Sequence, residues 1–211
     1  MASTDGTLQV IDNYRHSRMK LNSEADSGIY DALNKGIALA NGDVIGIMHS
    51  DDVYAHDRVL DNVVQIFKDA KVNAVYGDLN YISAGNSGRI VRRWKAGCFK
   101  RNKFKFGWMP PHPTLFLRKE VFMSLGNYDT TYQISGDFDA ILRWLRNANI
   151  KFFYLPQVLV NMRLGGESNR SISRILRKSF EGYQTIRKNN VGGFFTLVLK
   201  NLRKLPQFIN K

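Results

Sequence analysis

Cysteine is almost absent from this sequence, because Cys98 is the only one among 211 residues. A single thiol can form no internal disulfide, and it provides no cysteine-based metal site. Such sparse use of cysteine is typical of proteins in a reducing compartment.

Long apolar runs are also missing. The longest lies around Val191–Leu199, far below the roughly 20 residues that cross a bilayer. The opening residues, MASTDGTLQV, lack the basic segment and apolar stretch of a signal peptide. We therefore expect a cytoplasmic protein, either soluble or bound peripherally to the inner face of the plasma membrane.

Acidic residues are scarce over two long stretches, although the chain as a whole has the 44% hydrophobic content of a globular protein. Leu79–Lys119 contains ten Lys and Arg and no acid, and Arg163–Lys211 contains eleven basic and two acidic residues. These stretches together sum to +19, which exceeds the chain's net charge of +13, so the remainder is net negative. Basic regions attract polyanions, whether nucleic acid, anionic lipid or phosphorylated substrates.

Alternating helix and strand patterns predict an α/β domain with a mostly parallel sheet flanked by helices. Apolar spacing predicts helices over Leu8–Tyr14, Ile29–Ala40, Arg58–Asp69, Lys119–Leu125 and Asp137–Asn147. Short apolar runs predict strands over Lys20–Asn22, Val44–Met48, Ala74–Tyr76, Leu79–Ile82, Ile90–Trp94, Thr114–Leu117, Lys151–Leu155 and Val158–Arg163, with Pro156 breaking the last two apart.

The C-terminal residues differ from the rest in pattern. Ser171–Lys188 and Gly193–Ile209 predict two basic amphipathic helices. We expect residues 1–168 to form the α/β domain and residues 169–211 a basic helical extension. The first of these helices favours packing on the domain, and Gly193–Lys211 favours contact with an anionic membrane surface.

Asp51 and Asp52 follow the short apolar run at Val44–Met48 directly. Ligands of open α/β sheets bind at the carboxyl ends of the strands, where these two side chains would lie. Adjacent carboxylates repel each other unless a cation such as Mg²⁺ or Mn²⁺ offsets them. The alternative is a solvated turn in which an aspartate caps the next helix.

Three further groups carry candidate side chains. Asp137 stands at a predicted helix start, where it is either an ionised base or an ordinary N-cap. Asp26 and Lys35 surround another helix start, which either binds an anion or is a capped surface helix. His112 lies beside a basic loop and is either a ligand contact or structural.

Taken together, several motifs resemble the family 2 glycosyltransferases of bacterial polysaccharide assembly. They are SEADSGIYDALNKGIALANGDVIGIMHSDD, YGD, PPHPTLFLRKEVF, LGNYD, SGDFDAILRWL and RLGGESN, in that order, and the resemblance covers about Ser3 to Asn169. The resemblance implies the GT-A fold. It also implies that the chain lacks the strand, helix and strand with which family members begin, including an acidic residue of the nucleotide-base pocket.

The resemblance assigns a role to each candidate. Asp51 and Asp52 match the motif that binds the divalent cation, Mg²⁺ or Mn²⁺, and the diphosphate of a nucleotide-sugar donor. Asp137 matches the catalytic base of an inverting transfer, and Asp139 supports it. The remaining matches are Asp26 and Lys35 in the donor pocket and His112 on the acceptor side. The implied acceptor is a saccharide, typically lipid-linked.

Two other interpretations remain open. An inactive, truncated glycosyltransferase would serve as an interaction or membrane-docking module. A nucleic-acid-binding protein would use the loop containing Phe99, Phe104, Phe106 and Trp108, because aromatic rings beside cations can stack on bases. The sequence contains no nucleic-acid-binding motif, and a cluster of acids would repel phosphates, so we expect no nucleic-acid partner.

Overall fold

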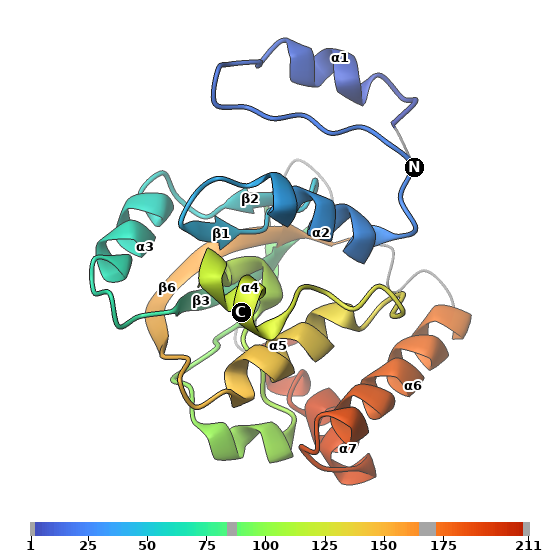
Figure 1. Ribbon diagram of the computed structural model, residues 1–211. Coiled ribbons are helices and arrows are strands. Elements are labelled where there is room, and N and C mark those ends of the chain that lie inside the picture. The colour runs from blue at the N-terminus through green and yellow to red at the C-terminus, as the bar shows by residue number, and fades with distance from the viewer. Residues whose placement is uncertain (1–2, 84–87, 165–171, 209–211) are drawn as a thin grey trace.

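The computed structural model describes residues 3–83, 88–164 and 172–208, and shows one sheet with helices on both faces (Figure 1). The strands run in the order β1-β5-β3-β6-β2, and β4 pairs with β3. They are β1 (Val44–Gly46), β2 (Asp52–Tyr54), β3 (Ala74–Ile82), β4 (Ile90–Trp94), β5 (Phe116–Arg118) and β6 (Phe152–Arg163).

Helices connect these strands and follow them. The α-helices are α1 (Thr7–Asp12), α2 (Ile29–Leu39), α3 (Val59–Phe67), α4 (Lys119–Leu125), α5 (Gly136–Arg146), α6 (Ile172–Lys188) and α7 (Phe194–Leu202). Short 3₁₀ turns are η1 (Arg101–Phe106), η2 (His112–Thr114) and η4 (Leu205–Phe208). The predicted helices are all present, and all but one agree within one or two residues. The exception is α7, which ends at Leu202 and not at the predicted Ile209, and Lys20–Asn22 forms no strand.

The sheet is mixed, which corrects the expectation of a mostly parallel one. Only β3 and β6 pair in parallel, and the other described pairs are antiparallel. The reason lies in the connections, because β4 and β5 follow β3 without an intervening α-helix. A chain that returns without a crossover helix pairs antiparallel.

The long parallel pair also differs from the sequence prediction. β3 is one strand through Gly77, and β6 continues through Pro156, which was expected to break it. The β3–β6 register shifts between Tyr76 and Asp78, so the proline lies where the ladder is already irregular and its missing N–H costs least. A Cβ at Gly77 would lie 2.5 Å from the Leu159 side chain, so a glycine allows the close approach.

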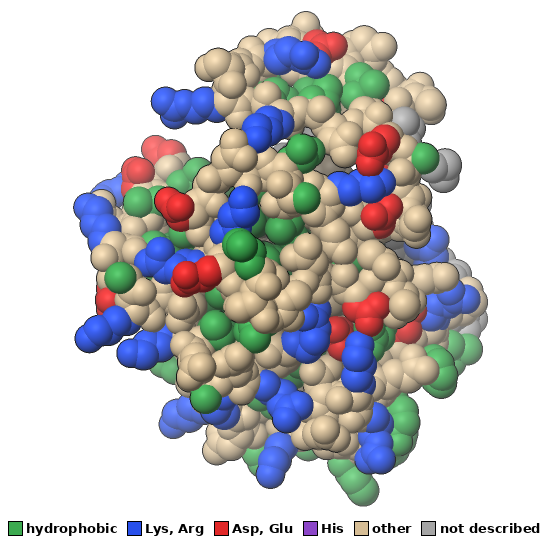
Figure 2. All heavy atoms as spheres, viewed as in Figure 1, with side chains coloured by type: hydrophobic (Ala, Val, Ile, Leu, Met, Phe, Trp, Pro, Cys, Tyr) green, Lys and Arg blue, Asp and Glu red, His purple; other side chains and the backbone are tan. Residues whose placement is uncertain are grey.

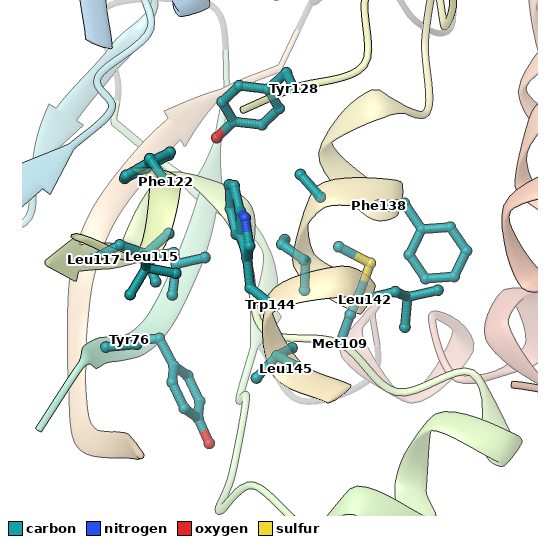
Figure 3. Packing of buried hydrophobic residues seen from close by; sticks show 14 of the residues in the cluster. Tyr76, Met109, Leu115, Leu117, Phe122, Tyr128, Phe138, Leu142, Trp144 and Leu145 are labelled. Atoms are coloured by element: carbon teal, nitrogen blue, oxygen red, sulfur yellow. The ribbon is translucent and has the colours of Figure 1, made fainter. Parts of the chain in front are cut away.

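Two apolar clusters hold the layers together. One joins α2, α4 and α5 to the sheet, and its centre is Trp144, which is fully buried among Tyr128, Phe122 and Leu117 (Figure 3). The other joins α3 to the opposite face, through Val59 and Val63.

Most aromatic side chains of the basic loop at residues 99–113 lie inside the protein. Phe104 and Trp108 are buried and pack with Phe99, while Phe106 is exposed. Trp108 Nε1 donates a hydrogen bond of 2.8 Å to the Ala96 carbonyl. Because these rings are core residues, most of the surface that favoured base stacking is absent.

The C-terminal helices pack on this core and on the basic loop. Ile186 and Val191 belong to the main apolar cluster, and Thr196 donates a hydrogen bond of 3.0 Å to the Lys105 carbonyl. Gly107, at φ 71°, allows α7 to approach closely, since a Cβ there would lie 2.5 Å from the Lys200 backbone. α7 is therefore fixed against the domain by a backbone contact that admits no side chain.

This contact predicts that Gly107→Ala destabilises the protein more than Gly97→Ala does. Both glycines have φ 71°, but a Cβ at Gly97 would meet nothing within 4 Å. The Gly97 variant should lose about 1–2 kcal/mol through its left-handed backbone. The Gly107 variant should lose a further 1–3 kcal/mol, roughly, through overpacking against α7. Urea unfolding measures both, and equal losses would contradict the packing argument.

Candidate functional site

Asp52 and Asp51 are adjacent in sequence but differ in environment. Asp52 begins β2 and is 7% exposed, whereas Asp51 lies exposed in the turn before it. The Asp52 N–H donates a hydrogen bond of 3.0 Å to the His49 carbonyl, which closes that turn. The turn therefore directs Asp52 inward and Asp51 toward solvent.

Both carboxylate oxygens of Asp52 are buried and have no hydrogen-bond partner among the residues that the structure describes. Burial raises the pKa of Asp52; His49 opposes this and Asp51 adds to it. An unpaired buried carboxylate is costly, and a bound cation would remove the cost.

A divalent cation with few protein ligands fits this arrangement. Within the described residues, no three His, Cys, Asp or Glu are grouped to hold a metal. Mg²⁺ commonly binds in this way, through one or two carboxylates together with substrate phosphates and water. The donor set at Asp52 is therefore suited to a cation that arrives with a phosphorylated ligand.

Asp137 lies half-buried in the first turn of α5, and its Oδ1 accepts a hydrogen bond of 2.8 Å from the Phe138 N–H. The loop before it is held by the buried carboxylate of Glu181 on α6. That carboxylate accepts hydrogen bonds from three successive backbone N–H groups, those of Gln133 (3.2 Å), Ile134 (2.9 Å) and Ser135 (2.8 Å).

Tyr30 of α2 fixes the other side of the same loop. Its hydroxyl donates a hydrogen bond of 2.6 Å to the Ile134 carbonyl. Its ring lies so close to Gly136 that a Cβ there would be only 2.7 Å away. The loop that carries Asp137 is therefore clamped between α2 and α6.

His112 is buried beside this loop and shares a hydrogen bond of 2.7 Å with the Tyr128 hydroxyl. Its ring lies 5.7 Å from that of His49, in the turn that precedes Asp52. Burial lowers the pKa of His112 to about 4, although Asp137 opposes the shift, so the ring is neutral at pH 7. His112 thus links the Asp52 turn to the Asp137 loop as a neutral, hydrogen-bonded side chain.

Tyr81 of β3 connects the two carboxylates electrostatically. Burial raises its pKa, the Arg92 guanidinium opposes the increase, and both Asp137 and Asp52 add to it. That guanidinium lies 4.4 Å from the Tyr81 ring centroid. The electrostatic environment of Tyr81 thus includes both Asp52 and Asp137.

Asp139 points away from this environment. Its fully buried carboxylate binds Arg143 Nε at 2.8 Å, Asn189 Nδ2 at 3.0 Å and Lys188 Nζ at 3.6 Å. These contacts join α5 to the end of α6, so Asp139 supports the position of α5.

Asp26 and Lys35 form a separate cluster. The Lys35 ammonium is 2.9 Å from Glu24, 3.0 Å from Asp26 and 3.1 Å from Asp31. Together with α1 and its following loop, Asp26 and Lys35 line a cleft of about 850 Å³ whose lining contains neither Asp52 nor Asp137. Because three carboxylates surround Lys35, its charge is already compensated.

Sequence reasoning missed several residues of the site, namely Tyr30, His49, Tyr81, Arg92, Tyr128 and Glu181. Glu181 had a visible signal, since it is the only acid among residues 172–208. The tyrosines had none, because their roles depend on contacts between distant segments, such as Tyr30 with Ile134.

Comparison with known families gives a match to glycosyl transferase family 2 over residues 2–126. The PGL/p-HBAD biosynthesis glycosyltransferase of Mycobacterium bovis (strain BCG / Pasteur 1173P2) is 27% identical over 177 residues, which cover 82% of this chain and 66% of the relative. Hyaluronan synthase of Pasteurella multocida is 26% identical over 175 residues, 82% of this chain and 18% of that protein. The chain thus spans 66% of the length of the first of these relatives.

Two solved structures share the fold. TarS 1-349 of S. aureus, in complex with UDP-GlcNAc, has a TM-score of 0.63 at 16% identity, over 90% of this chain and 54% of the TarS 1-349 chain. The mannosyltransferase PcManGT from Pyrobaculum calidifontis, in complex with GDP-Man and Mn²⁺, has a TM-score of 0.61 at 17% identity, over 99% and 61% of the two chains. The GT-A fold that the sequence implied is confirmed.

The Glu181 clamp predicts local loosening when its charge is removed. Glu181→Gln leaves one carbonyl oxygen and places an amide donor against backbone donors, so unfolding should become easier by about 2–3 kcal/mol. Hydrogen exchange should accelerate at the amides of Gln133, Ile134 and Ser135. Glu120→Gln, at an exposed carboxylate on α4, is the control and should stay within about 0.5 kcal/mol. Unchanged exchange at the three amides would refute the clamp.

Proposed function

Because the chain belongs to glycosyl transferase family 2, we propose that it catalyses transfer of a sugar from a nucleotide-diphosphate donor to a saccharide acceptor. The observation that carries the proposal is the buried carboxylate of Asp52, whose oxygens have no hydrogen-bond partner in the described part of the chain. In the turn before it, the His49 ring lies 5.7 Å from that of His112. Relatives in glycolipid and polysaccharide synthesis, and fold neighbours bound to UDP-GlcNAc and GDP-Man, support a nucleotide-sugar donor.

Asp52, assisted by Asp51, holds the donor diphosphate through a divalent cation, Mg²⁺ or Mn²⁺. When bound, the cation neutralises the charge that develops on the departing diphosphate. The presence of Mn²⁺ with GDP-Man in PcManGT supports this assignment. In this proposal Asp26 and Lys35 contribute from the α2 side, to a more distant part of the donor.

Asp137 takes the proton from the acceptor hydroxyl, which then displaces the diphosphate at the anomeric carbon with inversion. The Glu181 and Tyr30 contacts fix the loop that presents its carboxylate, and a positioned base typically contributes 10²–10⁴-fold. Neutral His112 orients the acceptor side without adding positive charge near the base.

The C-terminal helices supply a candidate membrane contact. Figure 2 shows hydrophobic side chains gathered at the lower right, over α6 and α7. α7 and η4 expose Phe194, Phe195, Leu202 and Leu205, and residues 172–208 carry eight Lys and Arg with one acid, the buried Glu181. Exposed apolar side chains beside cations suit a peripheral contact with anionic lipid, and hence a lipid-linked acceptor. In the described part of the chain, no helix is long and apolar enough to cross a membrane.

Nucleotide binding tests the donor side. In a thermal-shift panel of UDP, GDP, dTDP and CMP with Mn²⁺, one nucleotide should stabilise the chain by about 2.7 kcal/mol at 100 times its Kd. Asp52→Asn should lose this effect, and Asp61→Asn on the exposed face of α3 should keep it. Asp137→Asn should retain binding and lose at least about 100-fold in release of nucleoside diphosphate.

The same variants report on the charge of Asp52. Since the folded state favours its protonated form, ionisation of Asp52 costs stability once the pH rises above its unfolded value near 4. Without metal, Asp52→Asn should therefore be about 1 kcal/mol more stable than the wild type at pH 7. The assignment of Asp52 to the donor site would be wrong if the metal-free Asp52→Asn variant were less stable than the wild type. It would also be wrong if metal-dependent nucleotide binding survived the substitution.

Vesicle flotation tests the membrane contact. Binding to vesicles rich in phosphatidylglycerol should fall at least about tenfold in a Phe194→Ser, Phe195→Ser double variant, and should weaken with salt. Met123→Ser is the control, because Met123 is 79% exposed on α4. Equal binding to neutral phosphatidylcholine vesicles would exclude the anionic surface.

A further inference from the structure

Four half-buried cations gather where α6, α7 and β4 meet the start of α5. We define them as the cationic cluster: Arg92 of β4, Lys178 of α6, Lys200 of α7, and Lys204, which follows α7. The charge of Lys200 is not neutralised by an ion pair with a described residue. In the part of the chain that the structure describes, its ammonium has no hydrogen bond or carboxylate partner within salt-bridge distance.

The Lys200 ammonium is held between two helices. Its Nζ lies 3.6 Å from the centroid of the Phe138 ring, the residue next to Asp137. On α6 it faces Gly182, where a Cβ would lie 3.9 Å from Nζ. Phe138 is buried and belongs to the main apolar cluster, and Figure 3 shows its ring on the side of α5 opposite Trp144. The ammonium is thus directed at the start of α5, beside the proposed base.

The charges of the cluster destabilise one another. Burial lowers the pKa of Lys200 to about 7, with Lys204 and Lys178 adding to the decrease and Asp137 opposing it. Burial also lowers the pKa of Lys204 to about 8, with Lys178 and Arg92 adding to that decrease. By contrast, Lys35 has three carboxylates around one ammonium.

The cluster is fixed in place by its surroundings. The backbone of Lys200 lies against Gly107, and Thr196 bonds the Lys105 carbonyl. At the other end, Arg92 Nε donates a hydrogen bond of 2.7 Å to Gln207 Oε1 on η4. These contacts hold the backbone of Lys200 and the guanidinium of Arg92 in position, so an anion that binds there meets groups that are already placed.

We propose that the cationic cluster binds a phosphate group of the acceptor, on the Asp137 side of the site and separate from the donor diphosphate at Asp52. This inference rests on the proposed glycosyl transfer. Phosphate suits the cluster because it carries up to two charges and three acceptor oxygens, which a guanidinium and several ammonium groups can share.

The contacts of Lys200 place the cluster at the Asp137 end of the site. The Lys200 ammonium lies 3.6 Å from the ring of Phe138, the residue next to Asp137, whereas Asp52 lies in the turn that the His49 carbonyl closes. A phosphate held by the cluster would therefore place the acceptor hydroxyl near Asp137. The outward face of the same helix, α7, carries the exposed Phe194 and Phe195, which suits a phosphate attached to a lipid.

The test measures binding of methyl phosphate to the whole chain in EDTA by titration calorimetry. Lys200→Met with Lys204→Met should weaken binding at least about tenfold, since two charge-assisted contacts are lost. The matched control, Lys68→Met with Lys151→Met, makes the same two substitutions at exposed positions and should bind as the wild type does. An undiminished melting temperature shows that the double variant folds. Equal weakening by the control would overturn the proposal in favour of diffuse attraction.

A second titration distinguishes the two sources of phosphate. Methyl phosphate should still bind when Mg²⁺ and the nucleotide identified in the thermal-shift panel saturate the chain, and in the Asp52→Asn variant. Competition with the nucleotide, or a tenfold loss of nucleotide binding in the cluster variant, would assign the cations to the donor and overturn the acceptor site. The two proposals can fail separately. Metal-free binding of phosphate without any nucleotide binding would contradict the proposed glycosyl transfer and would leave the anion site supported.

Discussion

The carboxylate of Glu181 is the interaction on which the rest of the site depends. It satisfies three consecutive backbone N–H groups in the loop before α5, and it comes from a helix that is otherwise basic. Buried backbone donors without partners are costly, so the loop can keep this shape only while α6 is docked. Asp139 ties the same two helices together at the opposite end, through Asn189 and Lys188. The position of Asp137 therefore depends on two contacts of α6, one with the loop before α5 and one near its own C-terminal end with α5 itself.

The site is assembled from two parts of the chain. The Asp52 part depends on β2 and its antiparallel partner β6, which bury that carboxylate at the edge of the sheet. The Asp137 part depends on α5 to α7. The match to family 2 ends at residue 126, before Asp137, so the role of Asp137 rests on its geometry and on the motif in which it stands. Tyr81, in the central strand β3, is the side chain that both carboxylates influence.

Much of this arrangement could be predicted from the sequence, because hydrophobic spacing determines which segments become helices and which become strands. The α/β class, the GT-A fold and most helix positions are confirmed. Strand direction was not predictable in this way, since it depends on whether a helix crosses between strands, and β4 and β5 return without one. Pro156 is tolerated within β6 because the register is already shifted opposite it, which local sequence does not reveal.

At the site, the sequence located Asp51 and Asp52 but could not rank them, because a turn at His49 decides which one is buried. It favoured a binding role for Lys35, whose charge the fold directs onto three carboxylates. The aromatic residues of the basic loop looked like a surface for bases, and Phe104 and Trp108 are core residues instead. In each case the missing information is a contact between residues distant in the sequence.

The Glu181 contact also has a consequence for protein synthesis. Ser135 and Glu181 are 46 residues apart, so at roughly 5–20 residues per second the ribosome makes the loop about 2–9 s before its clamp. During that interval the nascent chain can already form β2 and the Asp52 turn, while the loop before Asp137 has unpaired backbone donors. A chain still being translated would therefore acquire the Asp52 end of the site first, and it would hold its base in place only after α6 had left the exit tunnel.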